Sequence, residues 1–209
     1  MGAHGGAGGH EATAAMVIYC WESLLAGLEG REATAVPDFE DGEAPLFVTW
    51  TTTEGVPSGA DADLRGCIGC LDPIRLRSGL AEYAQTSAFR DRRFSPIRKA
   101  EVPHLVCEVN LLTRFEEAKA WDDWAVGTHG IILEFSHQGR RFSATYLPHV
   151  AEQQGWDVPR TVDSLARKAG WQGPVDEAMR RAMRVTRYQS SAFELTWAQF
   201  CEATGRKAP

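Results

Sequence analysis

The chain has 209 residues, 44% of them hydrophobic and 10% aromatic, so it is long enough to bury a core that needs no disulfide or metal for stability. Its formal net charge of −6 excludes a protein that attracts nucleic acid through its overall charge. The five cysteines are odd in number and irregularly spaced, which is typical of reduced thiols inside a cell. The start of the chain has no signal-peptide pattern and no apolar run could span a bilayer, so we expect no membrane attachment.

The N-terminal third predicts a tail, one helix and two strands. Residues 1–12 are glycine-rich and predict a disordered tail. Apolar residues then recur at helical spacing, which predicts a helix that Thr13 caps and Gly30 ends. The β-branched and aromatic run "LFVTWTTT" predicts a first strand, and the run "LRGCIGC" at residues 64–70 predicts a second.

The middle of the chain predicts a helix, a strand and a hairpin. After a loop at Pro73, the stretch "SGLAEYAQTSAFRD" has one apolar face at helical spacing, with Ser78 as the expected cap. The run "HLVCEVNLL" alternates and predicts a strand. In "IILEFSHQGRRFSATYL" two strand-like runs flank Gln138 and Gly139, which predicts a hairpin with its turn at these two residues.

The C-terminal third predicts three helices and two strands. Pro148 suits the first turn of a short helix, Thr161 is expected to begin a second that Gly170 ends, and residues 174–182 predict a third. The runs "RVTRYQS" and "AFELTW" predict the last strands. Helices and strands are mixed without a regular strand–helix alternation, so we predict an α+β fold with a mainly antiparallel sheet and packed helices.

The motif "LRGCIGC" allows two interpretations of its first cysteine. On a regular strand Arg65 and Cys67 share one face and Cys70 faces away, which disfavours a dithiol or zinc pair, and we predict no metal and no cofactor. Arg65 would stabilise a nucleophilic Cys67 thiolate, while Gly66 and Gly69 would let a ligand approach the backbone. In the alternative interpretation Cys67 is a small buried residue and the glycines allow close packing.

Two arginine-rich segments are the candidate phosphate-binding residues. Residues 90–99 carry five basic residues against one acid, and residues 180–187 carry four arginines, so each segment has a local charge of +4. Together they predict a face on which Arg92, Arg93 and Arg187 hold phosphates with Arg65, while a base stacks on Phe94 or Tyr188. Two solvated helix ends would give the same pattern.

His129, in the glycine-flanked sequence "GTHG", is the candidate general base for Cys67. A loop histidine that binds a backbone group is the alternative.

The motifs resemble those of one known family. The runs "PLFVTW", "LRGCIG", "SGLAEYAQTSAFRDRRFSPI", "WAVGTHGI", "ATYLPHVAEQQGWD", "TVDSLARKAG" and "RVTRYQS" are similar to the AMMECR family, named for the Alport syndrome, midface hypoplasia and elliptocytosis chromosomal region. The resemblance implies a domain over residues 13–200 with a C-terminal tail at 201–209. It implies an α+β fold like the RAGNYA class, sometimes described as two subdomains, in a nuclear or cytoplasmic protein.

The resemblance also bears on function. Prokaryotic relatives occur beside a Memo-like domain and a radical SAM enzyme, which implies a part in the modification of RNA or another macromolecule. We therefore predict a protein that binds RNA or a nucleotide in a cleft around Cys67, bordered by Arg65, Gly69 and His129. The alternative is a non-catalytic adaptor that binds a protein partner. The sequence predicts no oligomeric state.

Overall fold

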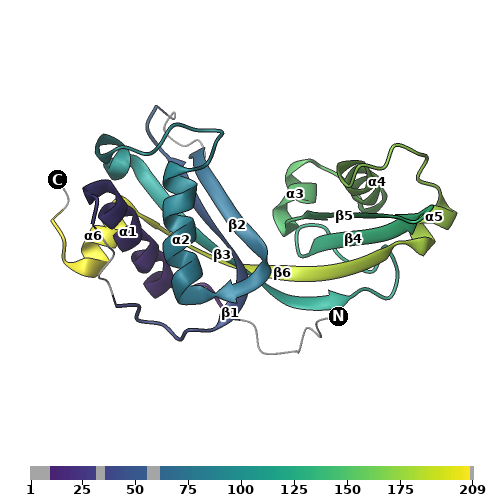
Figure 1. Cartoon of the computed structure of the whole chain (residues 1–209), viewed down its shortest axis with the longest axis horizontal. Helices are drawn as coiled ribbons and strands as arrows, with labels where there is room; N and C mark the ends of the chain where they lie inside the picture. The colour runs from purple at the N-terminus through teal and green to yellow at the C-terminus, as the bar shows by residue number, and fades with distance from the viewer. Residues whose placement is uncertain (1–9, 32–35, 56–61, 208–209) are drawn as a thin grey trace. The chain divides into compact units, whose positions relative to one another are not determined.

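A computed structural model of the chain describes residues 10–31, 36–55 and 62–207 (Figure 1). The described strands form one sheet in the order β2-β1-β3-β6-β4-β5. The pairs β1–β2, β1–β3, β4–β5 and β4–β6 are antiparallel. The predicted α+β class, with an antiparallel sheet and packed helices, is confirmed.

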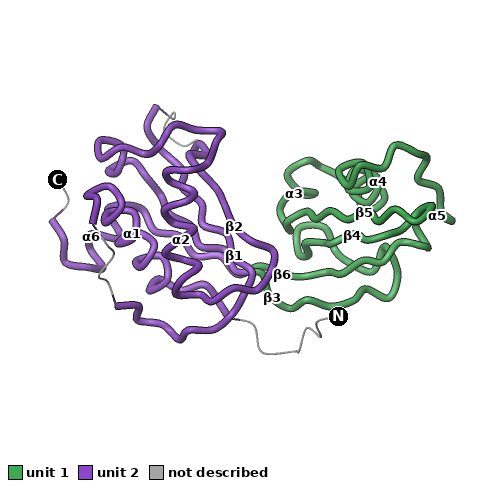
Figure 2. Tube along the Cα trace, in the orientation of Figure 1, with its two compact units in different colours: residues 1–9, 112–190 green, residues 10–111, 191–209 purple. Residues whose placement is uncertain are grey.

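The chain divides into two compact units, which Figure 2 colours separately. Among the described residues, unit 1 comprises residues 112–190, and unit 2 comprises those within residues 10–111 and 191–207. No helix among the described residues is both long and apolar enough to traverse a bilayer.

Unit 2 packs two helices against one face of its strands. Its elements are α1 (Ala14–Glu29), β1 (Glu43–Thr52), β2 (Asp63–Arg75), α2 (Leu76–Phe89), a 3-10 helix η1 (Lys99–His104), the first part of β3 (Leu105–Glu117), the last part of β6 (Arg184–Thr196) and α6 (Trp197–Thr204). In Figure 1, α1 and α2 lie side by side on the strands. Trp21 of α1, Trp50 of β1 and Leu80 of α2 are fully buried in their common core.

The predicted helices and strands of unit 2 differ from the structure at Pro73 and at Ser78. The first helix is confirmed: Gly30 ends it in the left-handed conformation, and Thr13 occupies the N-cap position, although its side chain makes no capping hydrogen bond. The loop expected at Pro73 was wrong: β2 continues to Arg75, because β2 is an edge strand, where proline is tolerated. Ser78 does not cap α2, which already begins at Leu76.

The two ends of the chain carry further expectations. Residues 1–9 of the predicted tail at 1–12 lie outside the described residues; Ala12 is buried and its N–H donates to Ser191 Oγ at 3.0 Å. The expected C-terminal tail at 201–209 starts inside α6, a helix that the sequence did not predict.

Unit 1 is built on a hairpin covered by helices. Its elements are the last part of β3, β4 (Gly130–His137), β5 (Arg140–Tyr146), α3 (Pro148–Gln153), α4 (Val158–Lys168), α5 (Glu177–Ala182) and the first part of β6. The core between α4 and the strands includes Leu133, Leu165 and Val185.

The predicted hairpin turn is confirmed, because Gln138 and Gly139 both have positive φ, 48° and 78°. Pro148 stands in the first turn of α3 as expected. Thr161 does not begin α4: Asp157 caps this helix by accepting a hydrogen bond from the Arg160 N–H. The two strands expected after residue 183 are one continuous strand, β6.

Candidate functional site

Cys67 lies in a row of side chains that crosses three strands of unit 2. Thr49 of β1 is directly opposite Cys67 of β2, and Glu108 of β3 is directly opposite Thr49. The Thr49 hydroxyl donates to Cys67 Sγ at 3.2 Å, so the two side chains share a face of the sheet. Trp50, the next residue of β1, points to the other face, where its indole N–H donates to the carbonyl of Ala84 in α2. The row therefore lies on the face turned away from the helices.

A second row lies beside the first on the same face. Phe47 of β1 is opposite Gly69 of β2 on one side and opposite Asn110 of β3 on the other. The Phe47 ring packs over Gly69, since a Cβ on that glycine would come within 2.4 Å of the ring. Only 8% of Asn110 is exposed, and its Oδ1 accepts no hydrogen bond from any residue that the structure describes. We call these two rows the motif face; its members are Phe47, Thr49, Cys67, Gly69, Glu108 and Asn110.

Burial disfavours the charged form of two members of the motif face. It raises the pKa of the Cys67 thiol, although the hydrogen bond from Thr49 and the charge of Arg93 act in the opposite direction. Burial also raises the pKa of the Glu108 carboxyl, and the negative charge of Glu194 adds to the rise. Burial therefore outweighs the two contacts that favour the thiolate expected at Cys67.

A turn after α2 binds the backbone of Cys67. Asp91 accepts a hydrogen bond from the Cys67 N–H at 3.0 Å, and Arg93 donates to the Cys67 carbonyl at 3.1 Å. Asp91, which is only 5% exposed, also accepts from the main chain and the guanidinium of Arg93, and these bonds hold the pKa of its carboxyl well below the usual range. Arg93 therefore stabilises the backbone of β2 at Cys67.

Arg65 does not contact the Cys67 thiol. Its guanidinium donates to the carboxylate of Glu101 at 2.8 Å and to the carbonyl of Ser95 at 2.7 Å. Both side chains of the Arg65–Glu101 pair are 12% exposed. Arg65 therefore fastens the segment after α2 to β2.

Packing accounts for the two motif glycines. Gly66 is buried, and a Cβ there would lie 2.1 Å from the carbonyl oxygen of Ser87, so α2 can approach β2 only at a glycine. The space above Gly69 is filled by the ring of Phe47. Their predicted contact with a ligand stays a prediction.

The segment 90–99 keeps two arginines free of carboxylates. Within the described residues, the side chains of Arg90 and Arg92 have no ion-pair or hydrogen-bond partner, and both are exposed. Phe94 is half-buried, with the guanidinium carbon of Arg93 at 5.3 Å from its ring centroid. Arg92 and Phe94 are thus placed next to the turn that holds Cys67.

The segment 180–187 is neutralised. Arg187 pairs with Glu116 at 2.9 Å and with Asp123 at 3.0 Å. The other three arginines pair with acids of unit 1: Arg180 with Asp163 and Glu177, Arg181 with Glu177, and Arg184 with Glu117. Tyr188 is fully buried and its ring stacks on Phe115, so the expectation that it stacks a base was wrong.

His129 belongs to unit 1 and Cys67 to unit 2. The Nδ1 atom of His129 accepts a hydrogen bond from the Ala125 N–H at 3.1 Å, which closes the turn before β4. A pairing of His129 with Cys67 as base and nucleophile stays a prediction.

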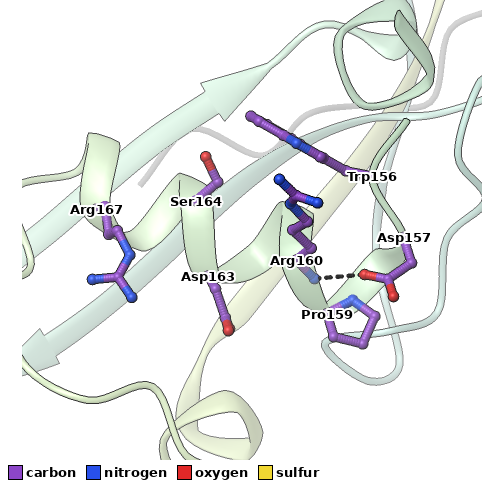
Figure 3. Close-up of a pocket in the computed structure, with 7 residues that line it drawn as sticks. All are labelled: Trp156, Asp157, Pro159, Arg160, Asp163, Ser164 and Arg167. Carbon is purple, nitrogen blue, oxygen red and sulfur yellow. Dashed lines mark hydrogen bonds between the residues drawn. The ribbon is translucent and has the colours of Figure 1, made fainter. Parts of the chain in front are cut away.

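Unit 1 has an open groove of about 540 Å³ on the exposed side of α4. Trp156 lies at one end with Arg160 near it, and Ser164 and Arg167 follow along the helix (Figure 3). The sequence analysis missed this groove, although Arg160, Ser164 and Arg167 recur at the spacing of one helix face. Among the residues that the structure describes, no three His, Cys, Asp or Glu side chains are placed to hold a metal ion.

Sequence analysis also missed Phe47, Thr49, Glu108 and Asn110. The signal for them is alternation: each lies between buried residues in a predicted strand, so each belongs to the second face. The register that aligns them with Cys67 is not visible in the sequence.

Comparisons with known proteins agree with the motifs. The AMMECR1 family model matches residues 17–193. An uncharacterised protein of Arabidopsis thaliana is 46% identical over 187 residues, which cover 88% of this chain and 86% of that protein. An uncharacterised protein of Schizosaccharomyces pombe is 36% identical, covering 87% of this chain and 92% of its own. The crystal structure of an uncharacterised protein from Pyrococcus horikoshii superposes with a TM-score of 0.66 at 28% identity, covering 86% of this chain and 89% of that one.

Proposed function

This chain belongs to the AMMECR1 family, and we propose that it binds a nucleotide or a short single-stranded RNA at the motif face of unit 2. The observation that carries the proposal is the position of Arg92. It stands between Asp91 and Arg93, which both bind the backbone of Cys67, and it has no carboxylate partner among the described residues. The turn that binds β2 at Cys67 therefore carries an exposed positive charge.

A local charge of this kind can bind phosphate although the whole chain carries −6. At physiological salt, charges separated by more than about 8 Å are largely screened from one another, so distant carboxylates do not cancel it. Arg92 and Arg90 would hold phosphates, and the predicted stacking partner Phe94 follows in the same turn. Arg187 is not needed, because its guanidinium is already held by two carboxylates.

The proposal assigns binding to the motif face and no covalent chemistry to Cys67. A thiol whose pKa is raised by burial is a poor nucleophile at neutral pH, which supports a contact role for this residue. If the protein takes part in the modification of a macromolecule, its role would be to bind that substrate and present it to an enzyme, in the nucleus or the cytoplasm.

Titration of the full chain with a fluorescent mixed-sequence RNA and with ATP, each at two salt concentrations, tests the proposal. The variant Arg92→Ala should weaken binding several-fold and reduce the slope of log affinity against log salt by about 1. The matched control is Arg184→Ala, which removes an exposed arginine that is paired with Glu117 and should leave binding unchanged.

Affinity that does not depend on salt, or an equal loss in both variants, would overturn phosphate binding at Arg92. Absence of binding to either probe would overturn the proposal and favour the adaptor alternative, in which the partner is a protein.

A further inference from the structure

We infer that the motif face contains a nucleobase subsite, in which a base stacks on Phe47 and donates a hydrogen bond from its N–H edge to Asn110 Oδ1. The inference rests on the proposed function and adds the part of the ligand that the arginines do not recognise. It is independent of Phe94, because Phe47 and Asn110 are neighbours across β1 and β3.

The first argument is the unsatisfied oxygen of Asn110. Buried side-chain amides in folded proteins almost always find hydrogen-bond partners, because an amide oxygen removed from water without one is costly. Asn110 is 8% exposed, yet its Oδ1 has no donor among the described residues. The oxygen itself is covered in the free protein, so a ligand N–H would supply the missing bond once the Asn110 side chain turns toward the open face of the sheet.

The second argument is the position of Phe47. Its ring packs over Gly69 and stays half-buried on the sheet face that α1 and α2 leave uncovered. It is absent from both hydrophobic core clusters, so packing in a core does not explain an aromatic ring at this position. Aromatic rings on a sheet face are the surfaces on which single-stranded nucleic acids stack their bases.

The third argument is the polar border of the subsite. Glu108 precedes Asn110 by two residues on the same face of β3, a separation of about 7 Å along the strand. On β1, Thr49 stands at the same spacing from Phe47 and contacts the Cys67 thiol. A flat ring on Phe47 would thus meet an amide on one strand and a hydroxyl on its own, which suits the mixed donors and acceptors of a base edge.

The experiment compares an RNA oligonucleotide with an abasic oligonucleotide of the same length and charge, both titrated against the full chain. The abasic probe should bind more weakly than the RNA. The variant Phe47→Leu should weaken the RNA complex by about fivefold to a hundredfold and leave the abasic complex unchanged. Thr51→Val, two rows from Phe47 on β1, is the matched control and should alter neither complex.

Asn110→Leu separates recognition from folding. It replaces an amide whose oxygen has no partner by an apolar side chain of similar size, so the free protein should melt at the same temperature or higher, while the RNA complex weakens about fivefold. A purely structural asparagine would instead lower the melting temperature and leave affinity unchanged, and that result would overturn the subsite.

The two proposals fail in different ways. Equal affinity for RNA and abasic probe, with both lost in Arg92→Ala, would overturn the subsite and leave phosphate binding intact. If Arg92→Ala binds as tightly as the parent chain and the RNA still binds more tightly than the abasic probe, the phosphate site alone would be overturned. If neither probe binds, both proposals fall.

Discussion

The segments 90–99 and 180–187 carry the same charge of +4 in the sequence, but the folded chain treats them differently. In the segment 180–187 each arginine has a carboxylate partner. In the segment 90–99 the carboxylate of Asp91 binds Arg93 and the Cys67 backbone, and Arg90 and Arg92 have no such partner within the described parts of the chain. Equal sequence charge thus produces a neutral surface in one unit and a cationic turn in the other.

For Arg184 and Arg187 the neutralising acids are far away in the sequence, whereas Arg181 pairs with Glu177 of its own helix. Glu116 lies 71 residues before its partner Arg187, and Glu117 lies 67 residues before Arg184. The strands β3 and β6 bring them together. An excess of arginines in one sequence segment therefore predicts a phosphate site only where the fold places no carboxylates beside those arginines.

The largest expected effect is a loss of stability on removal of Asp91, which binds the backbone of β2 at Cys67. Asp91→Ala removes the acceptor of the Cys67 N–H and of Arg93 and should lower the free energy of unfolding by about 2–3 kcal/mol in urea denaturation. Asp163→Ala breaks the half-exposed pair with Arg180 in the other unit and should cost about 1 kcal/mol.

The pH dependence checks the same residue. Because the folded-state pKa of Asp91 is lowered, its contribution is present above the ordinary aspartate pKa and is lost as pH falls through the folded value. Equal losses in Asp91→Ala and Asp163→Ala at neutral pH would contradict the structural contrast between the segments.

The sequence predicted those features that depend on nearby residues. The first helix is predictable because its apolar residues recur at helical spacing and Gly30 ends it, and the hairpin turn is predictable because Gly139 takes a positive φ without steric cost. The motif face was not predictable, because Asn110 becomes a neighbour of Phe47 only through the β1–β3 register.

The second prediction sharpens the contrast between paired and unpaired arginines. Arg187→Ala removes bonds to Glu116 and Asp123 and should lower the melting temperature by a few degrees. Arg92→Ala breaks no bond among the described residues and should leave the melting temperature unchanged. Thermal unfolding by circular dichroism measures both, and a clear loss in Arg92→Ala would mean that this arginine also has a structural role.

The smallest effect concerns a carboxylate that β3 does not pair. Glu116 and Glu117 pair with arginines, whereas burial raises the pKa of the Glu108 carboxyl and the negative charge of Glu194 adds to the rise. The folded chain then binds a proton at Glu108 more tightly than the unfolded chain, so this residue costs stability as pH rises from the ordinary glutamate pKa through the raised value. Glu108→Gln should therefore raise the melting temperature at neutral pH. The corresponding gain in the free energy of unfolding should be less than about 1 kcal/mol.

The gain should vanish with acid. Below about pH 4, Glu108 is protonated in both folded and unfolded chains, so the variant and the parent should converge. Glu116→Gln, on the same strand, removes a bonded carboxylate and should lower the melting temperature at neutral pH instead. Opposite signs for two glutamates of one strand would show that the arginines opposite them, and not the strand itself, decide whether a carboxylate stabilises the fold. Equal signs would contradict the distinction drawn between the two arginine segments.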